Sequence, residues 1–513
     1  MDALVPSLLQ PEAYAHPVDS VRLLETHISW VFLTGSYAYK VKKPVCFGFV
    51  DFSTAERRRH CCAEELRLNR RLAPELYLDV VTIHGPAERA CLHGSGPPLE
   101  VAVRMREFRQ EDLLPEALNR QTVAPQLIDG LAGDLARFHA SAAAAAAEAP
   151  WGSPELVLEP LLANLEALQG CSRLRPQHRE LRAWLLAEHQ RQRPLLEQRR
   201  AGGCIRECHG DLHLGNMVLR NGRITVFDGI EFSDALRWID PISDLAFLLM
   251  DLRHRRQHAL AARLLQGWLE QSGDHAALPL LPWYEAYRAL VRAKVAGLRL
   301  AQPNLQPDEA GALEDQLNAY LSQACQVLLP RHPALLLTHG VSGCGKSYAA
   351  ALLRERGWLH LRSDGERLRL FGRWGCSPVP QPPAADPYAE VVSAHLYDTV
   401  LAGAAAAALD AGLAVVVDAT FLRRNQRQRF RELARRAGAG FGILAPEVGP
   451  EEARRRIAAR QLAGDDPSEA DASVLEQQLQ RIEPLSDEEC GWRVAGVDDA
   501  RLSLPCTRLP VPG

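Results

Sequence analysis

Carboxylates, two imidazoles and Asn side chains gather in one short stretch, "ECHGDLHLGNMVLRNGRITVFDGIEFSD", residues 207–234. Asn221-Gly222 lies there between two apolar runs, and this dipeptide is the preferred two-residue turn of a β-hairpin, in which both central residues adopt positive φ. The turn brings three side chains with oxygen atoms to one open end of the hairpin, namely Asp211, Asn216 and Asp228. Such oxygens suit a divalent cation held against phosphate groups.

The register of this hairpin sets a condition on the metal site. In an ideal ribbon Asn216 pairs with Phe227, so Asp228 points to the opposite face. Both can bind one cation only if the chain leaves the ladder near Asp228, as strand ends beside functional sites often do. The alternative is a polar hairpin end that only caps loops.

A second candidate site is "GVSGCGKS", residues 340–347, which follows the apolar run "ALLLTH". This is the phosphate-binding loop pattern in its required context, a strand before a Gly-rich turn. Its backbone N–H groups would surround the β-phosphate, Lys346 would reach the β and γ oxygens, and Ser347 would bind Mg2+. The predicted nucleotide-binding residues are Gly340, Ser342, Gly343, Cys344, Gly345, Lys346 and Ser347.

Further polar residues follow predicted strands downstream. Asp364 and Arg367 come just after "LHLR", at the sheet edge where ligands bind, so the carboxylate could accept a proton from an attacking hydroxyl while the Arg holds an anion. Asp418 ends "VVVD" as an outer carboxylate for Mg2+. Arg456 and Arg460, four residues apart on one helix, could close over the phosphates or form an ordinary solvated face.

Composition limits the class of protein. A chain of 513 residues is too long for one ordinary hydrophobic core and suggests two or three domains. With 47% hydrophobic and 24% charged residues, its composition is that of a soluble globular protein. A net charge of -4 argues against a generally basic nucleic-acid binder. No leader and no apolar run long enough to span a bilayer stand out, which predicts a cytoplasmic chain that does not enter a membrane. No CxxC pair stands out either, so neither a disulfide framework nor a zinc site is expected. Only five of the 59 basic residues are Lys, and three lie together in "YKVKK".

The elements around these motifs change along the chain. The first hundred residues predict strands, with a hairpin around Thr34-Gly35-Ser36 and one helix starting at a capping box, Ser53 with Glu56. From 111 to about 328 the pattern is helical. After 331 strands and helices alternate, which predicts a parallel, doubly wound sheet, interrupted by the loop "GCSPVPQPPAADP".

The C-terminal pieces resemble the small P-loop kinases, particularly the branch with polynucleotide 5'-kinases, zeta-type toxins and small-metabolite kinases. The resemblance covers about residues 334–490. In polynucleotide kinases a D-x-x-R motif supplies the base and a phosphate-binding Arg, and "DGER" matches it at Asp364 and Arg367.

"HGDLHLGN" followed by "VFDGIEF" resembles the catalytic loop and metal-binding segment of aminoglycoside phosphotransferases and other kinase-like small-molecule kinases, and the likeness extends over about residues 25–300. The resemblance implies Asp211 as the base, Asn216 and Asp228 as Mg2+ ligands, His209 as a brace and Asp244 as a tether of the loop. It also implies a phosphate-contacting Lys40 with its partner Glu65, and an adenine contact near Met105. Lys42 and Glu64 remain rivals within one register step.

Together these features resemble a bacterial family that fuses the two kinds of kinase. We expect an α+β protein-kinase-like bilobal domain over 1–330, with an N-lobe of about 1–104 and a C-lobe of about 110–328, followed by an α/β P-loop kinase domain over 331–513. The expected activity is ATP- and Mg2+-dependent phosphoryl transfer to a hydroxyl of a small molecule at two sites.

Alternatives remain open. One alternative is a nucleotide-regulated binding protein in which one half is a pseudokinase, because "TGS" is a very short nucleotide-covering turn. A nucleic-acid 5'-end kinase is not favoured, and it predicts a basic groove of Arg367, Arg423, Arg424 and Arg427. A polycationic acceptor would need an acidic pocket, for which only Glu231 and Asp234 are candidates. The oligomeric state does not follow from the sequence.

Overall fold

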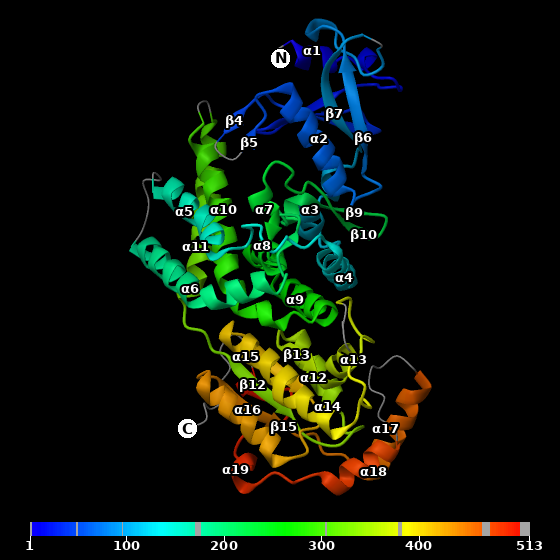
Figure 1. Cartoon of the computed structure of the whole chain (residues 1–513), viewed down its shortest axis with the longest axis vertical. Coiled ribbons are helices and arrows are strands. Elements are labelled where there is room, and N and C mark those ends of the chain that lie inside the picture. The colour runs from blue at the N-terminus through cyan, green and yellow to red at the C-terminus, as the bar shows by residue number, and fades with distance from the viewer. Residues whose placement is uncertain are drawn as a thin grey trace. The chain divides into compact units, whose positions relative to one another are not determined.

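Two units make up the chain in a computed structural model (Figure 1), and each is described by itself. The structure describes residues 3–47, 50–94, 96–169, 176–302, 305–377, 382–463 and 472–502. The first unit comprises 1–130, 141–157 and 195–248, and the second comprises 131–140, 158–194 and 249–513. The second unit thus contains helices that precede residue 331 in sequence, and the predicted boundary at 330 stays a prediction.

A five-stranded antiparallel sheet forms the start of the first unit, in the order β1-β2-β3-β7-β6. Its strands are β1 (Arg22–Glu25), β2 (Ser29–Leu33), β3 (Tyr37–Lys42), β6 (Tyr77–His84) and β7 (Pro98–Arg106). The predicted hairpin is confirmed, since β2 and β3 pair around Thr34-Gly35-Ser36. Helix α2 (Ala55–Asn69) packs on β6 and β7, with Cys62 and Leu68 buried.

The predicted start of α2 was wrong by one residue. Thr54 is the N-cap, and its hydroxyl accepts a hydrogen bond from the Arg57 N–H at 3.3 Å. Ser53 instead donates to Asp51 at 2.6 Å. Ser is on average the better N-cap residue, so the surrounding chain, and not the residue type, decides that Thr54 takes the position.

The chemistry-bearing hairpin of the first unit is β9 (Met217–Arg220) with β10 (Arg223–Val226). Arg220 pairs with Arg223, and Asn221 and Gly222 have φ of 50° and 70°, so the predicted turn is confirmed. A 3-10 turn, η4 (Leu214–Asn216), leads into the hairpin.

Helices account for most of the described chain from residue 114 to residue 324. Their bounds are α3 (Leu114–Asn119), α4 (Pro125–Ser141), α5 (Pro154–Gln169), α6 (Pro176–Ala201), α7 (Asp234–Arg237), α8 (Pro241–His254), α9 (His258–Ser272), η5 (His275–Leu280), α10 (Leu281–Leu300) and α11 (Pro307–Ala324). The helical pattern predicted from 111 to about 328 is confirmed.

A parallel sheet in the order β13-β14-β12-β15-β16 forms the core of the second unit. The strands are β12 (Ala334–Thr338), β13 (Leu359–Arg362), β14 (Ala414–Asp418), β15 (Gly440–Leu444) and β16 (Arg493–Val494). Every residue of β12 and β14 is buried, as expected for strands covered on both faces. The predicted doubly wound sheet is confirmed.

The helices of this sheet follow the strands in alternation (Figure 1). They are α12 (Lys346–Glu355), α13 (Ser363–Leu370), α14 (Glu390–His395), the π-turn η7 (Leu396–Leu401), α15 (Ala402–Asp410), α16 (Arg424–Arg436), α17 (Pro450–Ala463), α18 (Ala472–Arg481) and α19 (Asp487–Cys490). Ala350 and Leu353 of α12 pack on Leu336 and Val416 of the sheet.

The helical run Glu390–Asp410 has 21 residues and is, by length and composition alone, long and apolar enough to cross a membrane. The prediction that the chain has no such run was therefore wrong. Ala405, Ala408 and Leu409 on this run are nevertheless buried, and α15 contacts β14, as a core helix of a globular unit does.

Candidate active sites

The hairpin site brings together the catalytic-loop residues predicted from the first motif. The Asn216 side-chain amide donates to the carboxylate of Asp211 at 3.0 Å, and it lies 3.5 Å from the backbone oxygen of Asp228. The Lys40 ammonium bonds the Asp228 carboxylate at 2.5 Å. Asp211, Asn216, Asp228 and Lys40 therefore lie in one cluster.

The condition on Asp228 is met by the backbone. Phe227 N–H donates to the Asn216 carbonyl at 2.9 Å, so the predicted pairing persists, but β10 ends at Val226. Asp228 then adopts φ 63°, which is uncommon for a residue with a side chain and redirects it. Its N–H is held by the Tyr77 hydroxyl oxygen at 3.1 Å. Strained backbone of this kind concentrates at functional sites.

The loop before the hairpin is fixed from behind. Asp244 accepts hydrogen bonds from the backbone N–H groups of His209 and Gly210, both at 2.9 Å. His209 Nε2 lies 2.9 Å from the Phe227 carbonyl, and burial lowers the pKa of His209, so the ring is a neutral brace. The predicted positions of His209 and Asp244 agree with this geometry.

The rivalry between neighbouring lysines and glutamates has a structural answer. Glu65 is fully buried and binds Lys40 at 2.9 Å and Lys42 at 2.6 Å, whereas Glu64 pairs with Arg67 at the surface. Lys40 continues to Asp228, while Lys42 bonds Glu231. Burial alone would raise the pKa of Glu65, but the two ammonium groups outweigh it and lower it to about 2. Both lysines are thus part of one buried ion network.

An acidic pocket for a polycation is not formed by the two predicted carboxylates. Glu231 is buried against Lys42, and burial raises its pKa despite that partner. Asp234 pairs with Arg237 on the same short helix. Both candidate groups are instead used in ion pairs.

The turn at Thr34-Gly35-Ser36 and the strand at Met105 were predicted to contact the nucleotide. The Gly35 N–H donates to the Glu107 carboxylate at 2.6 Å. Met105 pairs with Ala38 on one side and Tyr77 on the other, and the chain leaves the sheet only after Arg106. The adenine contact near Met105 stays a prediction.

The P-loop site lies at the carboxyl ends of β12 and β14. Gly340, Gly343 and Gly345 have φ of 133°, 80° and 98°, values open to glycine. A Cβ at Gly343 would lie 2.6 Å from the Ala453 carbonyl oxygen, so this loop also needs glycine for space. Lys346 begins α12 and bonds the Val341 carbonyl at 2.7 Å, while Cys344 is buried 3.8 Å from the ammonium.

Asp418 ends β14 beside this loop. Burial would raise the pKa of its carboxyl, but hydrogen bonds from His360 and Ser347 and the charge of Lys346 lower it. An ionised carboxylate next to a hydroxyl is a hard oxygen donor set that fits Mg2+. Ser347 and Asp418 are thus brought together as predicted.

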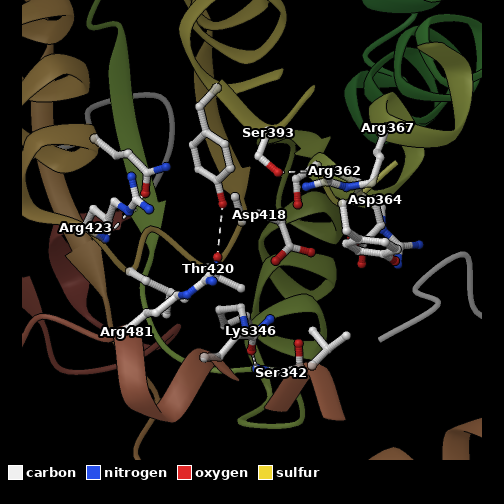
Figure 2. A pocket seen from close by; sticks show the side chains of 18 of the residues that line it. Ser342, Lys346, Arg362, Asp364, Arg367, Ser393, Asp418, Thr420, Arg423 and Arg481 are labelled. Atoms are coloured by element: carbon white, nitrogen blue, oxygen red, sulfur yellow. Dashed lines mark hydrogen bonds between the residues drawn. The ribbon is translucent and has the colours of Figure 1, made fainter. Parts of the chain in front are cut away.

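A cavity of about 1280 Å³ opens over the loop. Figure 2 shows Lys346 and Arg481 at one end, Asp418 in the middle, and Arg362, Asp364 and Arg367 grouped at another side. Ligand pockets are typically about 300–1,000 Å³, so this one has room for a nucleotide and an acceptor. Among the described residues, its lining has seven basic side chains against four acidic ones. The basic ones are Lys346, Arg362, Arg367, Arg423, Arg429, Arg456 and Arg481.

Arg367 lines this cavity near Asp364 (Figure 2). It is 8% exposed, donates to the Pro387 carbonyl and lies 4.9 Å from the Tyr388 ring centre. Among the described residues no carboxylate lies within ion-pair distance of it, and its Nε has no hydrogen-bond partner. A buried guanidinium without a counter-charge is costly, so the position suits an anionic ligand.

Of the two arginines predicted either to close over the phosphates or to form a solvated face, the structure describes the side chain of Arg456 alone. Arg456 lines the cavity, and its Nη1 would lie 3.4 Å from a Cβ at Gly345. Arg460 lies on α17, but its side chain is outside the described residues. Sequence reasoning missed α18, which contributes Arg481 and places Gln478 Oε1 2.6 Å from the Ser342 N–H. Nothing in the sequence distinguishes Arg481 from the other arginines near it, so no sequence signal indicated that it lines the cavity.

The predicted basic groove is smaller than expected. Arg423 lines the cavity and pairs with Glu390 at 2.8 Å. Arg427 is instead fully buried, with Glu489 at 2.7 Å and the Phe421 carbonyl at 3.0 Å as partners. Its assignment to a groove was wrong, because this face of α16 packs into the core.

The fold and the two clusters define a kinase-type phosphotransferase joined to a P-loop domain. A family model described as "Phosphotransferase enzyme family" matches residues 49–281, and one described as "AAA domain" matches residues 335–485. The fusion inferred from the motifs is thereby confirmed.

Relatives match more than two thirds of the chain. The chain is 34% identical over 369 residues to "Uncharacterized protein Rv2004c" of Mycobacterium tuberculosis and "Uncharacterized protein Mb2027c" of Mycobacterium bovis, covering 69% of this chain and 70% of each relative. It belongs to the family of these mycobacterial proteins.

Two solved structures are more distant. One, "Amicoumacin kinase hAmiN in complex with AMP-PNP, Ca2+ and Ami", is 17% identical at a TM-score of 0.38 over 62% of this chain and 92% of that chain. The other, a GDP complex of aminoglycoside 2'-phosphotransferase-IIIa, is 16% identical at 0.38 over 60% and 94%. At these TM-scores the likenesses carry no argument about ligands.

Proposed function

We propose that this phosphotransferase uses Mg2+ and ATP at two sites, each transferring the γ-phosphoryl group to a hydroxyl of a small molecule. The observation that carries the proposal is the P-loop cavity, where Lys346, Ser347 and Asp418 face Asp364 and Arg367 across one space. Phosphoryl transfer requires little covalent chemistry from the protein, and these groups supply positioning and charge.

The step at the P-loop site can be assigned to residues. The acceptor oxygen forms a bond to the γ-phosphorus, the bond from that phosphorus to the β,γ-bridging oxygen breaks, and ADP leaves. Asp364 takes the hydroxyl proton, and Lys346 holds the β and γ oxygens. Mg2+, when bound through Ser347 and Asp418, supplies neutralising charge between the two phosphates.

The acceptor at this site carries an anionic group. Arg367 is buried in the cavity wall without a carboxylate partner among the described residues, and basic side chains outnumber acidic ones in the lining. A polycation such as an aminoglycoside would be repelled from such a lining. A phosphate or carboxylate on the acceptor would be bound.

At the hairpin site Asp211 would take the acceptor proton, and Asn216 with Asp228 would bind the metal. A second function has support here, namely a regulatory nucleotide-binding half that transfers nothing. The Gly35 N–H is bound to Glu107, and Lys40 is bound to Asp228, so phosphate contacts at this site require both bonds to open.

The test is ATP turnover by the full chain with Mg2+, stimulated by anionic and cationic hydroxyl compounds. We expect anionic acceptors to stimulate turnover that Lys346→Ala removes by about 10²–10³-fold, in line with loss of one transition-state contact. Asp211→Asn should remove a different acceptor-stimulated turnover.

Lys294→Ala is the matched control, because Lys294 lies on α10 and lines neither site. Turnover that survives in Lys346→Ala for every acceptor would contradict the P-loop assignment. If Asp211→Asn changes no turnover, the hairpin half is regulatory.

A further inference from the structure

His360 lies on β13 next to Asp418 of the P-loop site, and among the described residues its side chain has one polar partner. Its Nε2 is 3.1 Å from Asp418 Oδ2, and the residue is 5% exposed. A carboxylate oxygen accepts hydrogen bonds, so the Nε2–H of His360 donates to Asp418. The imidazole is therefore fixed in one tautomer by the predicted metal-binding carboxylate.

The other ring nitrogen makes this arrangement costly. His360 Nδ1 is buried and has no hydrogen-bond partner among the described residues. Leaving a buried polar group without a hydrogen bond is unfavourable. An apolar side chain would fill the position more stably, so the contact with Asp418 is the property that this histidine supplies.

The backbone of His360 is held in turn by helix α9. The Gln266 side chain donates from Nε2 to the His360 carbonyl at 2.9 Å and accepts from the His360 N–H at 2.8 Å. Because β13 is the edge strand of the sheet, these backbone groups would otherwise lack a neighbour on that side. Gln266 is 5% exposed, and Glu270 accepts its second N–H at 2.7 Å.

The end of α9 also grips α13, the helix that carries Asp364 and Arg367. The Arg369 guanidinium of α13 donates to the Glu270 carbonyl at 2.6 Å and to the Gln271 carbonyl at 3.2 Å. These are carbonyls of the last helical turn, which need partners outside the helix. Residues 258–280 thus contact β13 and α13, the strand and helix that follow α12 in the P-loop site. These residues lie outside the range 335–485 that the family model matches.

From these contacts we infer that Gln266 and His360 are positioning residues for the divalent metal of the P-loop site, with Gln266 placing β13 and His360 orienting the Asp418 carboxylate. The inference rests on the proposed nucleotide site. One Asp418 oxygen is bonded by His360 at 3.1 Å, and the other lies 3.5 Å from the Thr338 hydroxyl, so His360 makes the shorter of these two contacts to the carboxylate. Outer-sphere partners of this kind typically contribute about 10–100-fold to metal affinity.

The test measures binding, not turnover. ATP affinity of the full chain is determined by calorimetry across a Mg2+ series, and binding left in Lys346→Ala is subtracted as nucleotide held elsewhere. We expect His360→Leu to raise the Mg2+ concentration for half-maximal ATP affinity by about 10–100-fold. His360→Gln, which keeps an N–H donor at similar reach, should restore most of it, and ATP affinity in EDTA should be unchanged in both.

Gln266→Met removes both backbone contacts at nearly constant volume, and it should shift the Mg2+ requirement in the same direction by a smaller factor. It also carries the test if His360→Leu does not fold. His189→Leu is the control, because His189 is a buried histidine of α6 that lines neither site.

Two failures are distinguishable. If wild type and Lys346→Ala bind ATP equally, the nucleotide site itself is wrong. If wild type loses ATP on Mg2+ removal but folded His360→Leu or Gln266→Met keeps the wild-type Mg2+ requirement, the positioning role is overturned and the proposed function stands.

Discussion

The hairpin site and the P-loop site both place a lysine near carboxylates, but they balance its charge differently. Lys40 is bound to Glu65 and Asp228 and shares Glu65 with Lys42. Lys346 bonds a backbone carbonyl, and in the described part of the chain no carboxylate lies within ion-pair distance of it. The first lysine must exchange a carboxylate partner to bind phosphate, whereas the second has no direct ion pair among the described residues to give up.

This difference follows from how each site is built. The P-loop is one local segment whose glycines turn backbone N–H groups inward, so it forms around an anion with little rearrangement. The hairpin site joins side chains from β3, α2 and the β9–β10 region, and each must be neutralised while no ligand is bound because burying a bare charge is expensive. We therefore expect the P-loop site to depend on single residues and the hairpin site to depend on its network.

The largest expected effect separates base from nucleotide binding at the P-loop. Asp364→Asn should lower acceptor-stimulated turnover by about 10²–10⁴-fold, the usual contribution of a general base, and leave ATP affinity unchanged. Initial rates and calorimetry measure the two quantities. Asp308→Asn, an exposed carboxylate of α11, is the control. Unchanged turnover would mean that Asp364 only caps α13.

The next effect tests the network of the hairpin site. Glu65→Gln leaves two buried ammonium groups short of a partner, so it should lower the free energy of unfolding of the first unit by about 3–5 kcal/mol. Glu64→Gln, one residue away, removes only a surface pair with Arg67 and should cost at most about 1 kcal/mol. Urea denaturation compares them. Equal losses would contradict the shared network.

Acid should weaken the buried ion network of the hairpin site. The pKa of Glu65 falls from 4.5 to about 2 on folding, so its contribution to stability is complete above pH 4.5 and is lost as pH falls toward 2. We expect a loss of order 3 kcal/mol in this window. Unfolding followed by circular dichroism from pH 6 to about 2 measures this loss of stability. In Lys42→Met the loss should be smaller, because one of the two ammonium groups that lower the pKa of Glu65 is gone. A flat wild-type profile would contradict it.

The smallest effect concerns the rim of the P-loop cavity. Arg423→Gln removes an exposed pair with Glu390, which should change stability by about 0.2–1 kcal/mol while raising the KM of an anionic acceptor, most at low salt. Arg427→Gln should instead destabilise the unit, because Arg427 is buried with Glu489. Melting curves and KM values against salt separate the two. An unaltered KM would place the acceptor away from Arg423.

The sequence alone determined the parts whose signal is local. Asn221-Gly222 predicts its hairpin because the turn needs two positive φ values within two residues, and "GVSGCGKS" predicts its loop because strand, glycines and Lys are contiguous. The alternation after 331 predicts the parallel sheet for the same reason. Even the pairing of Asn216 with Phe227 follows from counting residues from the turn.

Only the tertiary structure decided which charged groups share a partner. Lys40 and Lys42 lie on the same face of β3, and the packing of α2 places Glu65, not Glu64, between them. Arg427 and Arg423 look alike in sequence, but the fold buries one and exposes the other. Gln266 reaches His360 across 94 residues of chain. Ion pairs and buried hydrogen bonds depend on distance in space, which the order of residues does not encode until the layers have packed.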